Sequence, residues 1–172
     1  MSNQQENPEL RQKPAFRFAT RDDVSLVFEF IKGLAEYERM LPEVSASREL
    51  LEHWLFDKQA AEVLFAMIDG REVGFALYFI SFSTFLGKAG LYLEDLFVLP
   101  EYRKRGIGKA LLEELAHIAV DRGYGRMEWA VLDWNEPSIG FFRSLGAVDM
   151  SEWTTYRLTG DALTKLAEGS EA

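Results

Sequence analysis

Cysteine is absent from the 172 residues of this chain, and histidine occurs only twice. The lack of cysteine excludes disulfides, thiolate metal sites and cysteine nucleophiles. His53 and His117 lie far apart in the sequence, so we expect both on helix surfaces rather than in a catalytic pair. The sequence therefore predicts no bound metal.

The chain also lacks long apolar runs and a surplus of basic residues. No uninterrupted apolar stretch reaches membrane-spanning length, and the first residues, MSNQQENPEL, lack the apolar core of a signal peptide. The 28 acidic and 19 basic residues give a net charge of −9, which argues against a nucleic-acid binder and is compatible with a cationic substrate. We therefore expect a soluble, cytoplasmic protein that binds neither nucleic acid nor membranes.

Apolar residues make up 48% of the chain, enough for a sizeable core. The polar start, with Pro8 and Pro14, predicts a disordered lead at 1–14, followed by a single domain at 15–172. Apolar alternation and turn signals predict strands at 16–20, 62–68, 72–83, 91–99, 126–132, 148–150 and 153–158. Helices are expected from Asp22 or Asp23, after Ser45 or Ser47, from Ile107, from Asn135 to Gly146, and at 161–166. Because several strands precede the central helix, the order predicts an α/β (α+β) fold with a mixed sheet of about seven strands, flanked by helices.

The stretch Leu91 to Leu112, LYLEDLFVLPEYRKRGIGKALL, concentrates the features of a binding site. An apolar strand ends at Pro100, a basic turn with two glycines follows, and an apolar stripe at helical spacing begins at Ile107. The first amides of a helix lack internal partners, and glycines let a large anion approach them. A phosphate or diphosphate is the natural ligand of such a turn, although a basic, solvated helix start would give the same pattern.

The spacing of this turn narrows the choice of ligand. Ala110 stands where a P-loop needs Ser or Thr, and Leu111 stands where a dinucleotide fingerprint needs a third glycine. The pattern Arg103-x-x-Gly106-x-Gly108 instead resembles the diphosphate-binding turn of the GNAT superfamily of N-acetyltransferases. The order of predicted elements resembles the GNAT fold over residues 15–166.

Three further stretches resemble the spermidine/spermine and thialysine acetyltransferase branch of that superfamily. They are Leu34–Glu38 (LAEYE), Leu93–Val98 (LEDLFV) and Asp133–Ser138 (DWNEPS). The resemblance implies acetyl-CoA as cosubstrate, a small-molecule amine as acceptor and a homodimer. It implies that the cofactor is bound by Leu96, Phe97, Val98, Arg103, Lys104, Arg105, Gly106, Ile107, Gly108, Lys109, Asn135, Glu136, Pro137 and Ser138. It implies that the amine faces Tyr37, Glu38, Glu94, Glu128, Trp129 and Ala130.

The sequence departs from this branch at two positions. Phe142 stands where the branch carries a tyrosine, its proposed general acid, and Thr154 stands where it carries an acidic residue on the substrate side. Phe142 cannot donate a proton, although the leaving thiolate has an ordinary pKa of only ~8.5 and needs little help to depart.

A protonated amine must lose a proton before it attacks, because an alkylamine has a pKa near ~10.4. Glu94 is the best candidate for the general base, directly or through a water. It stands in an apolar strand, which we expect to desolvate its carboxyl and raise its pKa. An edge carboxylate in a surface ion pair is the alternative for Glu94. We expect an N-acetyltransferase that moves acetyl from acetyl-CoA to a primary amine of a small cationic substrate, such as a polyamine or lysine-like amine, by direct attack. The alternatives are an acyl-CoA-binding sensor with little catalysis and a protein or peptide N-acetyltransferase.

Overall fold

The computed structural model describes residues 13–169, so most of the predicted disordered lead lies outside the described residues. The chain divides into two compact units, one ending at Ala130 and the other beginning at Val131. The first unit contains the whole sheet, and the second contains two helices joined by irregular chain.

The first unit begins with strand β1 (Ala15–Phe18), the single turn η2 (Arg21–Asp23) and helix α1 (Val24–Tyr37). The turn η3 (Leu41–Glu43), the short helix α2 (Arg48–Glu52) and the π-helical turn η4 (His53–Asp57) follow. Ser47 caps α2 as predicted, because its side chain accepts a hydrogen bond from the Leu50 amide at 3.2 Å. Then come β2 (Glu62–Ile68), β3 (Arg71–Ser83), β4 (Lys88–Val98), the turn η5 (Pro100–Tyr102), helix α3 (Ile107–Asp121) and β5 (Met127–Trp129).

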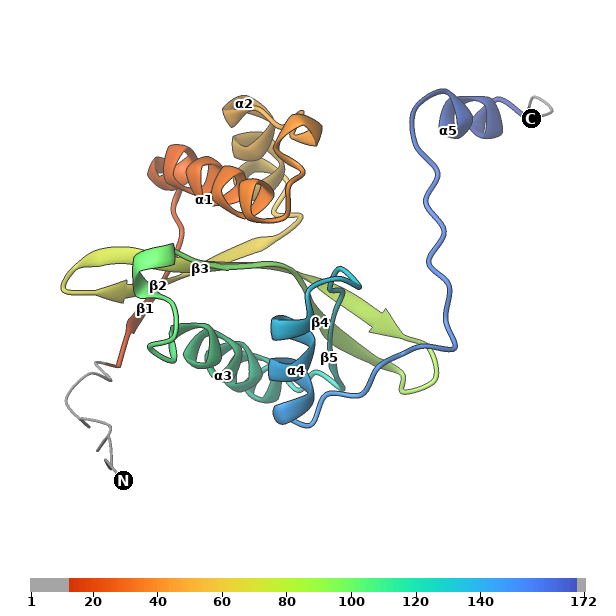
Figure 1. The fold of residues 1–172 in the computed structure, drawn as a ribbon. Coiled ribbons are helices and arrows are strands. Elements are labelled where there is room, and N and C mark those ends of the chain that lie inside the picture. The colour runs from red at the N-terminus through yellow and green to blue at the C-terminus, as the bar shows by residue number, and fades with distance from the viewer. Residues whose placement is uncertain (1–12, 170–172) are drawn as a thin grey trace. The chain divides into compact units, whose positions relative to one another are not determined.

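The five strands form one mixed sheet in the order β1-β2-β3-β4-β5. The first three pairings are antiparallel and β4–β5 is parallel. The predicted turn between β2 and β3 is present, with positive φ at both Asp69 and Gly70. Helices α1 and α2 cover one face of the sheet and α3 covers the other (Figure 1). The predicted mixed sheet flanked by helices is therefore confirmed.

The core lies between α1 and the sheet. Aromatic rings dominate it: Phe30 of α1 stacks on Phe75 at 5.2 Å and meets the edge of Phe97 at 6.2 Å between ring centroids. On the other face, α3 buries the stripe predicted from its spacing, which includes Leu111 and Leu115. Because both faces of β3 and β4 are packed, these strands form a rigid platform on which a site can be built.

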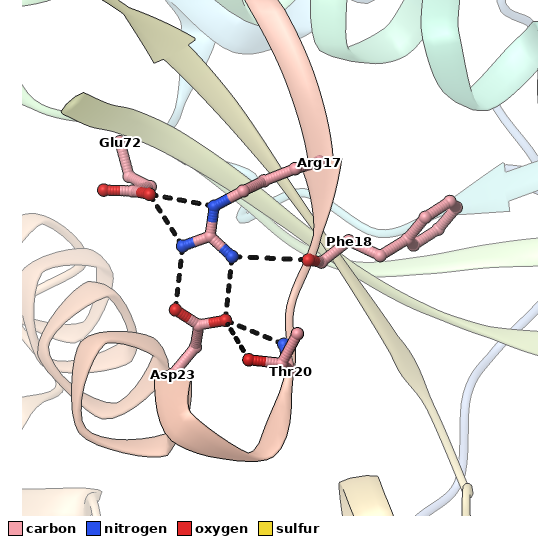
Figure 2. Close-up of polar contacts among 5 residues, drawn as sticks. All are labelled: Arg17, Phe18, Thr20, Asp23 and Glu72. Atoms are coloured by element: carbon pink, nitrogen blue, oxygen red, sulfur yellow. Dashed lines mark hydrogen bonds and ion pairs between the residues drawn. The ribbon is translucent and has the colours of Figure 1, made fainter. Parts of the chain in front are cut away.

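A network of charged side chains fixes the start of α1 to the sheet (Figure 2). Arg17 of β1 donates two hydrogen bonds to Asp23, each 2.8 Å long, and two to Glu72, at 2.6 and 2.9 Å. Asp23 also accepts the Thr20 amide at 2.7 Å, which closes the turn before α1. One guanidinium therefore joins β1, the turn η2 before α1 and the beginning of β3.

The second unit contains α4 (Glu136–Ser144) and α5 (Gly160–Ala167). Asn135 caps α4 as predicted, accepting the Ser138 amide at 3.4 Å, and Gly146 ends the helical segment with φ +87°. The strands predicted at 148–150 and 153–158 are wrong, because neither segment pairs with a strand among residues 13–169. The predicted strand at 126–132 is shortened to three residues. The sheet therefore has five strands rather than about seven.

Candidate active site

The outer edge of β4 has no strand beside it over its last residues. Leu99 donates its amide to the Val73 carbonyl at 2.9 Å, so the opposed residues Gly74 and Val98 form a non-hydrogen-bonded pair. The backbone N–H and C=O of Val98, and those of Leu96 two residues earlier, consequently point away from β3. Strand β5 pairs with β4 only as far as Leu93, so within the described chain no strand occupies this edge. The Val98 carbonyl accepts a hydrogen bond from Arg103 Nε at 2.9 Å. The Val98 N–H and both backbone groups of Leu96 can bind the amides of an extended ligand or a developing oxyanion.

A β-bulge in β4 lies immediately before this free edge. Leu77 of β3 is opposite Asp95, whereas the next residue, Tyr78, is opposite Leu93, so Glu94 is the extra residue of the bulge. Glu94 is exposed, contrary to the expectation that the apolar strand would desolvate it. Asp95 is instead the more buried of the two carboxylates. Its pKa is raised to about 7 by desolvation and by the charges of Glu94 and Glu38. The structure thus supplies two adjacent carboxylates in different environments.

Carboxylates gather on the α1 face of the sheet next to this edge. Glu38, directly after α1, acts electrostatically on Asp95, and burial raises its own pKa. Glu128 of β5 is opposite Tyr92 of β4, and the pKa of Tyr92 is raised by burial and by the charges of Glu94 and Glu128. The predicted substrate residues Glu38, Glu94 and Glu128 therefore lie in one acidic region.

The other predicted substrate residues are more dispersed. Tyr37, the last residue of α1, is partly exposed. Trp129 follows Glu128 in β5, and successive strand residues point to opposite faces, so the indole lies on the face away from Glu128. Ala130 is exposed directly after the strand.

The turn after β4 has the geometry of an anion site. Lys104 and Gly106 both adopt positive φ, +61° and +83°, and α3 begins at the next residue. The Ala110 amide donates a helical hydrogen bond to the Gly106 carbonyl at 2.9 Å. The amides of Ile107, Gly108 and Lys109 precede it at the first turn of the helix. A Cβ placed on Gly106 would meet no atom within 4 Å, so the space over the turn is open. These features fit the predicted binding of a diphosphate.

Three of the four cations of this turn already bind groups of the protein, so they are less available to an anion than the sequence suggested. Arg103 donates its Nε to the Val98 carbonyl at 2.9 Å, and Arg105 donates to the Glu101 carbonyl at 2.8 Å. Lys109 pairs with Glu113 at 2.9 Å. Lys104 is exposed, and within residues 13–169 its side chain makes no hydrogen bond or ion pair. The backbone amides and Lys104 are therefore the groups of the turn most open to an anion.

A pocket of about 550 Å³ lies between α1, the start of β3 and η5, within the size range of small-molecule sites. Its floor includes Phe30 and Phe97, and its walls carry both carboxylates and guanidinium groups. Tyr37 lines it, which connects the pocket to one predicted substrate residue.

The remaining predicted residues belong to the second unit. Asn135 and Ser138 form the cap of α4, and Glu136 and Pro137 form its first turn. Phe142 lies on the same helix with its ring 5.5 Å from that of Phe141. These positions agree with the predicted helix.

The burial of Asp95 and the packing of Arg103 were not predicted from the sequence. The signal for Asp95 was present, because a second carboxylate in an apolar strand must either be exposed or have its pKa shifted. No sequence signal places the extra residue of the bulge, which decides which carboxylate is exposed. Likewise, the motif identified Arg103 as a cation but not the rings against which it packs.

Residues 13–169 contain neither a candidate membrane-spanning helix nor a cluster of metal ligands. None of the helices there combines the length and apolar character needed to cross a bilayer. No group of three or more potential metal ligands from His, Asp and Glu was found there.

Sequence comparisons connect the chain to known enzymes. The profile described as "Acetyltransferase (GNAT) family" matches residues 29–147. A thialysine N-epsilon-acetyltransferase of Sus scrofa is 36% identical over 163 residues, covering 88% of this chain and 95% of that protein. The L-ornithine N5-acetyltransferase NATA1 of Arabidopsis thaliana is 49% identical over 90 residues, covering 52% of this chain and 40% of that protein.

Solved structures show the same fold. The integron cassette protein VCH_CASS6, from the mobile metagenome of V. cholerae, superposes with a TM-score of 0.76 at 28% identity. The superposition covers 91% of this chain and 99% of that one.

Proposed function

Since the chain belongs to the GNAT family and is an acetyl-CoA-dependent N-acetyltransferase, we propose that it acetylates a primary amine of a small cationic molecule. The observation that carries this proposal is the free edge of β4 beside the acidic region of Glu38, Glu94 and Asp95. Thialysine and ornithine, named for two of the relatives, are both small amines, so a polyamine or lysine-like amine fits the proposal.

In this proposal acetyl-CoA lies with its diphosphate at the first turn of α3 and its pantetheine arm along β4. The backbone groups of Leu96 and the Val98 amide hydrogen-bond the arm, and the amides at 107–109 bind the diphosphate. Bound there, acetyl-CoA supplies an activated acetyl thioester. A strand amide at the same edge stabilises the negative charge that develops on the carbonyl oxygen.

The acidic region binds the substrate as an ammonium ion and then accepts its proton. Glu94, exposed at the bulge, takes that proton directly or through a water, and Asp95 exchanges protons near neutral pH. The neutral amine attacks the thioester without a covalent enzyme intermediate. Phe142 provides no acid, which is tolerable because the departing thiolate is a good leaving group.

A coupled assay for free CoA with a panel of amines tests the proposal. Diamines, polyamines, lysine, ornithine, thialysine and short peptides are compared at equal concentration. Saturable release of CoA with one or more small amines is expected, and preference for peptides would assign the enzyme to protein substrates instead. Glu94→Gln should lower kcat while leaving the Kd for CoA unchanged, so an unaffected kcat would remove Glu94 from the mechanism.

A further inference from the structure

The Arg103 side chain connects three parts of the first unit. Its Nε bonds the Val98 carbonyl at the end of β4, and its guanidinium carbon lies 4.6 Å from the centroid of the Tyr37 ring and 5.2 Å from that of Phe97. Arg103 itself belongs to the turn before α3. One partly buried cation therefore touches the diphosphate turn, the strand edge and the last residue of α1.

Each of these contacts involves a residue that lies next to a group used in the proposed reaction. The Val98 carbonyl is on the free edge of β4, so the bond from Nε sets the orientation of that peptide. Phe97 is held in turn by α1, since a Cβ on Gly33 would lie 3.0 Å from its ring. Tyr37 directly precedes Glu38, which acts on Asp95.

We propose that Arg103 is a positioning residue, which aligns the edge of β4 with α1 instead of binding the diphosphate directly. This inference rests on the proposed function for the identity of the ligand along β4. The amides of the first turn of α3 and Lys104 then carry the diphosphate.

Calorimetric titration with CoA tests this positioning role, and it needs no turnover. Tyr37→Leu removes one face of the stack without touching the turn, and we expect it to weaken CoA binding about 3- to 5-fold. Arg103→Gln should weaken binding about 10-fold, and the double variant should be no weaker than Arg103→Gln alone, because both changes break one arrangement. Arg71→Gln is the matched control: Arg71 also lies over a tyrosine, 5.8 Å from the Tyr102 centroid, and its loss should leave the affinity unchanged.

Arg103→Lys separates positioning from charge. Lysine keeps the positive charge but has neither the planar face nor the Nε donor, so we expect it to bind CoA as weakly as Arg103→Gln. Recovery of parental affinity in Arg103→Lys, with no effect of Tyr37→Leu, would show that Arg103 is a simple anion ligand. Circular dichroism melting of every variant confirms that the compared proteins are folded.

Acetyl-pantetheine, which lacks the diphosphate, gives an independent test. A positioning role predicts that Arg103→Gln lowers kcat/KM by the same factor with acetyl-pantetheine and with acetyl-CoA. A loss confined to acetyl-CoA would overturn the inference. If no amine supported turnover at all, the proposed function would fail, while the calorimetric result for Arg103 would still stand by itself.

Discussion

Among single residues, Asp95 shows most directly how position alters chemistry. It is adjacent to the exposed Glu94, yet burial and two neighbouring carboxylates raise its pKa to about 7. Unfolding returns this carboxyl to an ordinary pKa near ~3.9. Between these two values the folded chain binds more protons than the unfolded chain, so the contribution of Asp95 to stability decreases as pH rises.

We therefore predict that the free energy of unfolding of Asp95→Asn rises, relative to that of the parent, as pH increases from 4.5 to 8. The change in relative free energy of unfolding should be about 1–3 kcal/mol, because each pK unit is worth about 1.4 kcal/mol and the site is only partly buried. Urea denaturation at several pH values measures it. Asp121 is exposed, so Asp121→Asn is the control. Its difference from the parent in free energy of unfolding should not change with pH. If the difference for Asp95→Asn were also independent of pH, the Asp95 carboxyl of the parent would have an ordinary pKa.

At the scale of elements, the start of α3 combines backbone conformation with ligand binding. Gly106 has φ +83°, which a residue with a Cβ adopts only with strain, and the space over it is open. We predict that Gly106→Ala lowers stability by about 1 kcal/mol and weakens CoA binding by at least about 10-fold, because the new methyl group occupies the diphosphate position.

Gly123, at the opposite end of α3, provides a matched control. Its φ is +71°, and a Cβ there would also meet nothing within 4 Å. Gly123→Ala should therefore cost the same stability in thermal denaturation and leave the Kd for CoA unchanged in calorimetry. Equal loss of CoA affinity in both variants would place the diphosphate elsewhere.

The network around Arg17 leads to a prediction about the start of α1. The hydrogen bonds from Arg17, and then from Thr20, hold the pKa of Asp23 well below its usual range. The contribution of ionised Asp23 to folding stability is fully present above its unfolded-state pKa of ~3.9. It is lost as pH falls below that value towards the lower pKa of the folded state. Asp23→Asn should cost about 1–3 kcal/mol at pH 7, since one partner of a partly buried charged pair is removed, and the cost should shrink towards pH 3.

Chemical denaturation of Asp23→Asn and of the exposed neighbour Asp22→Asn measures this cost. Only the change at Asp23 should matter, because the Arg17 bonds go to Asp23. An equal, small effect of both substitutions would show that the network contributes no more than solvated surface charges.

The elements that sequence predicted correctly are those with a local cause. Ser47 and Asn135 cap helices, Asp69 and Gly70 turn the chain, and the apolar stripe of α3 appears as expected. The strands at 148–150 and 153–158 were predicted from local pattern, which identifies residues suited to pairing but not the edge that would pair with them. The same limit applies to the site, where the turn at Gly106 could be predicted but the bulge at Glu94 could not.

At the scale of the molecule, the β3–β4 hairpin presents an uncharged surface on a chain of net charge −9. No charged residue occurs from Leu77 to Gly87, and Ile80, Phe82 and Phe85 are 57%, 64% and 96% exposed. The pairing of β2 with β3 ends at Tyr78, so among the described residues no strand lies outside Phe79–Ser83 on that side. Free edges with apolar side chains favour association, and an isologous contact between two copies would pair this edge with itself.

The homodimer was predicted from the family resemblance, and we predict that this surface forms its interface, which sedimentation velocity can test. We predict that the parent is a dimer at micromolar concentration and that Phe82→Glu is a monomer, because each buried large apolar side chain is worth about 1.5–3 kcal/mol and a carboxylate there would face its own copy. Added salt should strengthen the parent dimer, since it screens repulsion between two acidic chains. Val120 of α3 is 76% exposed and lies outside the hairpin, so Val120→Glu adds the same charge as a control and should remain dimeric. A parent that sediments as a monomer, or a Phe82→Glu variant that stays dimeric, would remove the hairpin from the interface.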